Sequence, residues 1–319
     1  MRKNFILLIA LCPIISLGQA NKIFRQASRE TDLSKKIELY TQVISLEPSN
    51  LDAYFYRAIA KNDLGDFSGA IVDYSKIIVE EPDADTYYNR GNSRYSLKDF
   101  LGAKDDYAKA YMLDKNFLDA LYSLACVKFD LGEYEEAIED LSSLLKISPE
   151  LSHVYTLRGA AYKALEKYQN ALKDYTAAIF INPSVDTYYN RGVFLMDVKY
   201  YEEANNDFKK VLRADRNNAY GYFYSGASNL FLGKFLNAIE DFSKALEFDS
   251  VDFDAYLGLA MAYNRINDIE KAKANFDKAN AIISPNEAIN TIEKYGNTYW
   301  YQNQYYYFNN QINELAGLR

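Results

Sequence analysis

The chain has 319 residues, 49% of them hydrophobic, which is enough for a sizeable folded body at or just beyond the usual size of one compact domain. Its formal net charge of −8 disfavours binding to nucleic-acid phosphates, and no basic run is long enough to offset it. One histidine and two cysteines, one of them in the apparent leader, exclude a histidine-rich metal site, a thiolate cluster and an intramolecular disulfide in the mature chain.

The segment 1–20 has the three-part layout of a secretory signal peptide. Two cations open the segment, the stretch 5–17 is almost wholly apolar, and the small residues Gly18 and Ala20 precede a cut after Ala20. About 13 apolar residues are too few to span a bilayer, which needs about 20. We therefore expect an exported protein, periplasmic or secreted, with no transmembrane segment after cleavage.

Two alternatives for this leader remain open. It could be an uncleaved anchor or a buried helix, or it could carry a lipid on Cys12. The lipoprotein reading is the weaker, because Leu11 precedes the cysteine where a small residue should stand.

The segment 52–285 repeats one pattern seven times, with a period of roughly 34 residues. A small residue marks each unit, and a second small residue follows it at a fixed distance. Large, mostly aromatic side chains recur at three further positions, one before the first small residue and two after it. The first column is Ala58, Gly91, Ala125, Gly159, Gly192, Gly226 and Ala260, and the second is Ala70, Ala103, Ala137, Ala171, Ala204, Ala238 and Ala272.

This spacing predicts two amphipathic helices in each unit, because apolar residues recur at intervals of three and four. Small residues where the helices cross let the backbones approach, and the aromatic rings fill the space beside them. Gly65 and Gly132 suit the turn inside a unit, since glycine adopts the left-handed conformation freely. Prolines mark the joints just past the second helices: Pro48, Pro82, Pro149, Pro183 and Pro285.

A charge pattern accompanies the repeat. Four units have an arginine directly before the first small residue, and each of them has an aspartate at the same later position, directly before a recurrent large side chain. We predict that these residues form ion pairs between the two helices of a unit; a basic peptide-binding row is the alternative. The predicted pairs are Arg57–Asp73, Arg90–Asp106, Arg158–Asp174 and Arg191–Asp207.

The unit from Ala53 to Pro82 resembles a tetratricopeptide repeat, and the resemblance extends over about four-fifths of the chain. It implies an all-α, right-handed superhelical α-solenoid of helix–turn–helix repeats, seven full ones over 52–285 and a degenerate one over 21–51. In the degenerate unit Lys36 stands where the second small residue belongs. The residues that carry the resemblance are Ala53-Tyr54-Phe55-Tyr56-Arg57-Ala58, Leu64-Gly65-Asp66-Phe67, Ala70-Ile71, Asp73-Tyr74 and Pro82.

Residues 286–319 leave the repeat pattern, and 299–308 are exceptionally rich in aromatic residues. A solenoid needs a terminal cap with a polar outer side. We expect a capping helix over about 287–315, broken near Gly296. The alternative is an exposed aromatic patch for a glycan or a partner helix.

The resemblance also implies that the first helices line a concave inner face. Aromatic and amide side chains occupy that face here; they give a large contact area and can pair with an extended peptide. Family members that hold chaperone tails place lysine or arginine there, and only Asn89 and Asn92 partly match that clamp. The predicted binding residues are Phe55, Tyr88, Asn89, Asn92, Tyr122, Tyr189, Asn190 and Phe223. The alternative is that the tyrosines only pack helix on helix.

The sequence thus predicts a non-enzymatic scaffold of the cell envelope that binds a protein or peptide. It leaves open whether the protein is a monomer or a homo-oligomer. It contains no phosphate loop, paired-histidine site or nucleophile elbow, so we predict no catalytic residue, cofactor or metal. Cys126 and His153 are expected to pack rather than react.

The alternative function is glycan or cell-wall binding. Sugar rings stack on exposed aromatic faces, so this function requires that Tyr88, Tyr189, Phe223 and Trp300 be exposed.

Overall fold

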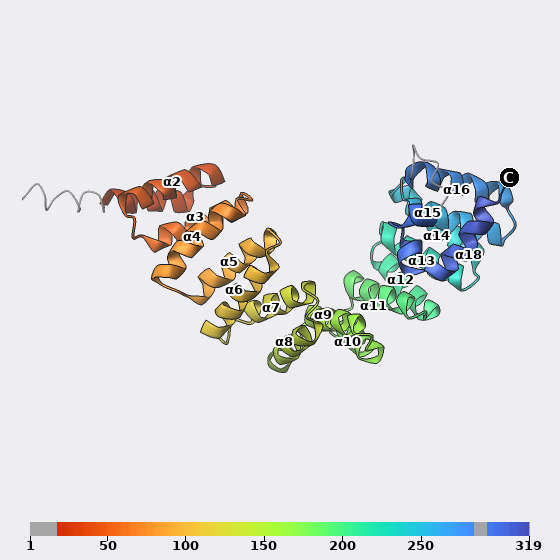
Figure 1. Cartoon of the computed structure of the whole chain (residues 1–319), viewed down its shortest axis with the longest axis horizontal. Coiled ribbons are helices and arrows are strands. Elements are labelled where there is room, and N and C mark those ends of the chain that lie inside the picture. The colour runs from red at the N-terminus through yellow and green to blue at the C-terminus, as the bar shows by residue number, and fades with distance from the viewer. Residues whose placement is uncertain (1–17, 284–291, 319) are drawn as a thin grey trace, which may run out of the picture. The chain divides into compact units, whose positions relative to one another are not determined.

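The computed structural model describes residues 18–283 and 292–318, and helices are the regular elements found there. The chain divides into two compact units, one up to Pro149 and one from Glu150. Figure 1 labels the helices of both units. Most of the predicted leader, residues 1–17, lies outside the described residues. No helix within the described ranges is long and apolar enough to cross a membrane.

The N-terminal unit is a series of helix pairs in which each helix packs against the next. A helix over residues 18–29 and the following α2 form the degenerate first pair, and three regular pairs come after it. The bounds are α2 (Leu33–Leu46), α3 (Leu51–Asp63), α4 (Phe67–Glu80), α5 (Ala84–Ser96), α6 (Phe100–Leu113), α7 (Leu118–Asp130) and α8 (Tyr134–Ile147).

The C-terminal unit holds four further pairs and the tail. Its first helices, α9, α11, α13 and α15, also contact one another in chain order and so form a continuous layer. The bounds are α9 (Ser152–Ala164), α10 (Tyr168–Ile181), α11 (Val185–Asp197), α12 (Tyr201–Ala214), α13 (Ala219–Phe231), α14 (Phe235–Phe248), α15 (Phe253–Arg265) and α16 (Ile269–Ile283), then η1 (Ile292–Tyr295), α17 (Tyr299–Asn303) and α18 (Tyr305–Ala316). The predicted all-α repeat architecture is confirmed.

Close packing explains why the first small-residue position of each unit excludes larger side chains. A Cβ atom added to Gly91 would lie 2.8 Å from the ring of Tyr107, and one added to Gly192 would lie 2.7 Å from the ring of Phe208. Both distances are shorter than van der Waals contact. The aromatic ring of the second helix therefore packs directly on the backbone of the first.

The turn inside each unit places one residue in the left-handed region. Gly65, Gly132 and Gly233 have φ values of 87°, 78° and 72°. The equivalent residues in the other units are Lys98, Glu166, Lys199 and Asn267, with φ values between 56° and 65°. The turn is thus the same in all seven units, although only three of them have glycine there.

All four predicted ion pairs are present, each with two hydrogen bonds from the guanidinium to the carboxylate at 2.6–2.9 Å. The arginines also reach the preceding unit, because Arg57 donates to the Thr41 hydroxyl at 3.0 Å and Arg90 to the Ser75 hydroxyl at 3.0 Å. The pairs therefore join three helices, where the sequence predicted two.

Over 292–318 the tail forms the short helices η1 and α17 and the 12-residue α18, where the sequence predicted one broken helix. The chain turns between η1 and α17, close to the predicted break at Gly296, and turns again at Gln304 between α17 and α18. α18 packs on α15 and α16 and thus covers the end of the last unit. The start of the predicted cap, residues 287–291, lies outside the described residues.

Candidate functional site

In the N-terminal unit the predicted inner-face aromatics are half-buried on consecutive first helices. Phe55 on α3 packs edge-on against Tyr74, with ring centroids 5.9 Å apart. Tyr88 on α5 lies 4.8 Å from the Phe117 ring and 5.7 Å from the Tyr107 ring. Each ring is therefore fixed by its neighbours while part of its surface stays accessible.

Tyr122 on α7 occupies the equivalent position one unit further on, beside Cys126. Burial raises the pKa of the Cys126 thiol to about 11. Such a thiol is protonated at neutral pH and is a poor nucleophile. Cys126 is a packing residue, as the sequence predicted.

The two predicted asparagines of this unit differ in what they leave accessible. The Asn89 amide donates to the backbone oxygen of Asp85 at 2.8 Å, within its own helix. The Asn92 carbonyl oxygen accepts from the Tyr107 hydroxyl at 2.8 Å, while its two amide hydrogens have no partner in the part of the chain that the structure describes. Asn92 therefore offers an oriented donor pair.

In the C-terminal unit the predicted residues separate into an accessible pair and a covered one. Tyr189 and Asn190 on α11 are half-buried, and the Tyr189 ring packs edge-on against Tyr224 at 5.6 Å. Phe223 on α13 is only 5% exposed, because Tyr299 and Trp300 of the tail lie 5.2 Å and 6.0 Å from its ring. The chain itself occupies the surface that was predicted for a partner at Phe223.

Trp300 fixes the tail in this position. Its side chain is completely buried among Phe223, Phe231 and Phe242, and its indole N–H donates to the backbone oxygen of Asp254 at 2.8 Å. Trp300 therefore has no exposed face for a sugar ring. The glycan hypothesis required Trp300 and Phe223 to be exposed, and both are buried.

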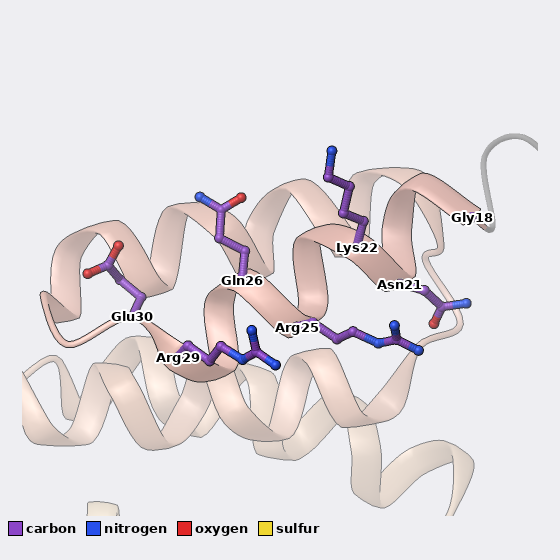
Figure 2. Close-up of a pocket in the computed structure, with 7 residues that line it drawn as sticks. All are labelled: Gly18, Asn21, Lys22, Arg25, Gln26, Arg29 and Glu30. Carbon is purple, nitrogen blue, oxygen red and sulfur yellow. The ribbon is translucent and has the colours of Figure 1, made fainter.

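Sequence reasoning missed a basic face on the first helix. Lys22, Arg25 and Arg29 are exposed and line an open hollow of about 710 Å³ (Figure 2). The other residues that line it are Gly18, Asn21, Gln26 and Glu30. Figure 2 shows Arg25 and Arg29 leaving successive turns on the same side of the helix. A search for uninterrupted basic runs overlooks such a face, because helical spacing places its members three and four positions apart.

The repeat sequences identify the protein family. The family model described as "Tetratricopeptide repeat" matches residues 84–117, 118–151, 152–184, 185–218 and 253–286, together more than half of the chain. The chain belongs to the tetratricopeptide-repeat (TPR) family. The unit over 219–252 lies outside these matches, and there Ser225 and Asn229 replace the arginine as hydrogen-bond donors to Asp241, at 2.7 Å and 2.8 Å.

Curated relatives share only part of their length with this chain. Human tetratricopeptide repeat protein 13 is 32% identical over 135 residues, which are 42% of this chain and 16% of that protein. Human serine/threonine-protein phosphatase 5 is 36% identical over 119 residues, 37% of this chain and 23% of the phosphatase. Yeast heat shock protein STI1 is 35% identical over 92 residues, 28% of this chain and 16% of that protein.

Many solved structures share the fold, including the following three. A tetratricopeptide repeat protein from Parabacteroides merdae has a TM-score of 0.58 at 20% identity, covering 73% of this chain and 93% of that one. Cut9–Hcn1 of the APC/C has a TM-score of 0.53 at 18% identity, covering 86% and 54%. MamA has a TM-score of 0.50 at 24% identity, covering 53% and 92%.

These similarities define what kind of protein this is. The phosphatases match only through their TPR region, and TPR repeats are a non-catalytic scaffold. TPR proteins bind protein or peptide partners. The chain is therefore a protein–protein interaction scaffold.

Proposed function

We propose that this TPR protein is a scaffold of the cell envelope that holds an extended segment of a partner protein against the first helices of its N-terminal unit. The observation that carries the proposal is the row of half-buried rings, Phe55, Tyr88 and Tyr122, together with the Asn92 amide hydrogens, which no described residue accepts. Preformed rings give contact area at low entropic cost, and amide donors pair with backbone carbonyls.

Site-specific crosslinking tests the position of the partner. Benzoylphenylalanine in place of Tyr88 should form a covalent adduct with a partner protein in the native envelope. The same group in place of Tyr306, which is 87% exposed on α18, serves as the control and should not. Equal adducts at both positions, or none at position 88, would rule out this face as the site.

A double substitution tests the energetic contribution of the same residues. In a pull-down without a crosslinker, Tyr88→Ala with Asn92→Ala should lower recovery of the partner identified by crosslinking at least about tenfold, since interface hot spots cost about 2 kcal/mol or more. Tyr306→Ala should leave recovery unchanged. The melting temperature of each variant separates lost binding from lost folding.

The envelope location is proposed from the leader. Cleavage after Ala20 would leave Asn21 as the first residue of the mature protein. N-terminal sequencing of the protein recovered from the periplasm or medium should read Asn-Lys-Ile-Phe. Recovery of the intact chain from the cytoplasm would contradict export, and a lipid on Cys12 would point to the anchored form.

A further inference from the structure

The basic face of the first helix is charged on one side and tightly packed on the other. Ala27 is completely buried against α2 and α3, and the Phe24 ring lies 5.4 Å from Tyr40 and 5.9 Å from Tyr56. The apolar side fixes the helix on the body of the unit. The direction of the opposite side is therefore fixed as well.

The cations of this face lack the carboxylate partners that three arginines of the same unit have. Arg57, Arg90 and Arg94 each bind a buried aspartate. Lys22, Arg25 and Arg29 form no ion pair with any residue in 18–149. The nearby carboxylate of Glu30 pairs with Lys35 and accepts the backbone N–H groups of residues 31 and 32.

The register of the repeat aligns these cations with the proposed peptide site. Arg25, Ile59 on α3 and Asn92 on α5 occupy the same position in three successive units. In the same way Lys22 corresponds to Tyr56. Equivalent positions of stacked units lie side by side. The basic face thus lies at the N-terminal end of the line of equivalent first-helix positions that includes Asn92.

Between the cations and the amides lies an aromatic surface. Tyr56 is 45% exposed, and its ring stacks on Tyr40 at a centroid distance of 6.0 Å. Phe24, Ser28, Tyr56 and Ile59 help to line a hollow of about 330 Å³ beside it. Asp63 and Lys36, which carry opposite charges, also line this hollow, so the net positive charge lies on the face of Lys22, Arg25 and Arg29.

We propose that the partner segment is acidic: side-chain carboxylates of an extended peptide bind Lys22, Arg25 and Arg29, and its backbone continues across Tyr56 to Asn92. This inference rests on the proposed function, whose partner class it names. Guanidinium groups bind carboxylates through paired, charge-assisted hydrogen bonds. A long polyanion such as nucleic acid is repelled by the remainder of a chain with a net charge of −8. A flat anionic membrane would use the cations but not the amides of Asn92.

The test uses a fluorescein-labelled peptide in which glutamate alternates with serine, amidated at its C-terminus so that only side-chain carboxylates are present. Fluorescence anisotropy at low salt measures its Kd for the purified protein. Arg25→Glu with Arg29→Glu should weaken binding at least about tenfold, and Arg25→Gln with Arg29→Gln should weaken it less. The affinity should fall as salt is added, because exposed charges are screened.

The matched control reverses two cations elsewhere in the same unit. Lys109 on α6 and Lys146 on α8 are exposed and form no ion pair among the described residues. Lys109→Glu with Lys146→Glu changes the net charge equally and should change Kd less than about twofold, as screened, distant charges do. Melting temperatures confirm that each variant folds.

Each of three results would overturn the inference. The wild type does not bind the glutamate peptide, the control variant loses as much affinity for it as the Arg25→Glu with Arg29→Glu variant, or a lysine–serine peptide binds the wild type equally tightly. Binding of phosphatidylserine vesicles or of duplex DNA that depends on Arg25 and Arg29, without peptide binding, would assign the face to a different ligand. If the Arg25→Glu with Arg29→Glu variant still forms the adduct at position 88, the partner segment is not acidic, while the proposed function stands.

Discussion

At the residue scale, the buried aspartates show how the repeats are joined. Asp207 is 1% exposed and binds the Arg191 guanidinium at 2.7 Å and 2.9 Å, and its other cation, Lys210, is 3.7 Å away. Asp106 binds Arg90 and also Arg94, at 2.9 Å. The two sites therefore differ in how much compensation remains when the main arginine is lost.

This difference gives a stability prediction. Arg191→Leu should cost about 3–5 kcal/mol, because it leaves a buried carboxylate without a close cation. Arg90→Leu should cost less, since Arg94 stays on Asp106. Adding Asp207→Leu to Arg191→Leu should recover part of the loss, as measured by urea unfolding. A double variant less stable than the single one would contradict the pairing.

The left-handed turn position gives a second prediction. Lys98 and Glu166 have φ values of 61° and 56°, which cost a side-chain-bearing residue about 1 kcal/mol or more relative to glycine. Lys98→Gly and Glu166→Gly should each raise the free energy of unfolding by about 0.5–1 kcal/mol. Gly65→Ala, at the same position of another unit, should lower it by a similar amount or more. A loss of stability in both glycine variants would show that their side chains contribute more than the strain costs.

At the element scale, the tail is an integral part of the C-terminal unit. Trp300 is completely buried, so Trp300→Ala should lower the free energy of unfolding by about 3–5 kcal/mol and increase binding of a hydrophobic dye to the uncovered rings. Tyr306→Ala, at a residue 87% exposed in the same tail, should stay within about 0.5 kcal/mol of the wild type. Equal effects would mean that the tail is not docked as described.

We expect the contact between α15 and the tail to depend on pH. Burial raises the pKa of Asp254 to about 7, although the Tyr299 N–H, which donates to its carboxylate at 3.0 Å, acts in the opposite direction. An acid whose pKa is raised by folding stabilises the fold at low pH. That contribution is lost as the pH rises from about 4, where the unfolded chain titrates, through 7.

Asp254→Asn tests this effect, since its amide oxygen can still accept the Tyr299 N–H. The variant should melt several degrees above the wild type at pH 8, because about 1 kcal/mol shifts Tm by roughly 2–4 °C in a body of this size. The difference should shrink toward pH 4.5, where the wild-type carboxyl is protonated. A constant difference between the two pH values would contradict the raised pKa.

At the scale of the whole molecule, the predicted binding residues are of two kinds: some are buried by the chain's own tail, and others stay accessible to a partner. Phe223 lies under the tail, whereas Tyr88 keeps an accessible face. Phe223→Ala should therefore lower the melting temperature and leave crosslinking at position 88 intact, and Tyr88→Ala should reduce partner recovery with a smaller loss of stability. The opposite pattern would assign the binding surface to the C-terminal unit.

The sequence predicted the repeats and their ion pairs because both follow a fixed period, which a single chain displays many times. It did not predict the cover over Phe223, because the tail shares no register with the units it packs on. It also missed the face of Arg25 and Arg29, since cations three to four positions apart are contiguous only after the helix forms. Periodic features were therefore predictable, and contacts between non-repeating segments were not.

The position of Trp300 has a consequence for how this protein could change in length. The indole and its neighbours in the tail contact rings on α13 and α14 and the backbone of α15, all in the last two units. Duplication or removal of an upstream unit would leave every one of those contacts intact. An array with fewer or more units would thus keep its C-terminal cap. Engineered versions with a different number of units should be made by inserting or deleting whole units upstream of α13.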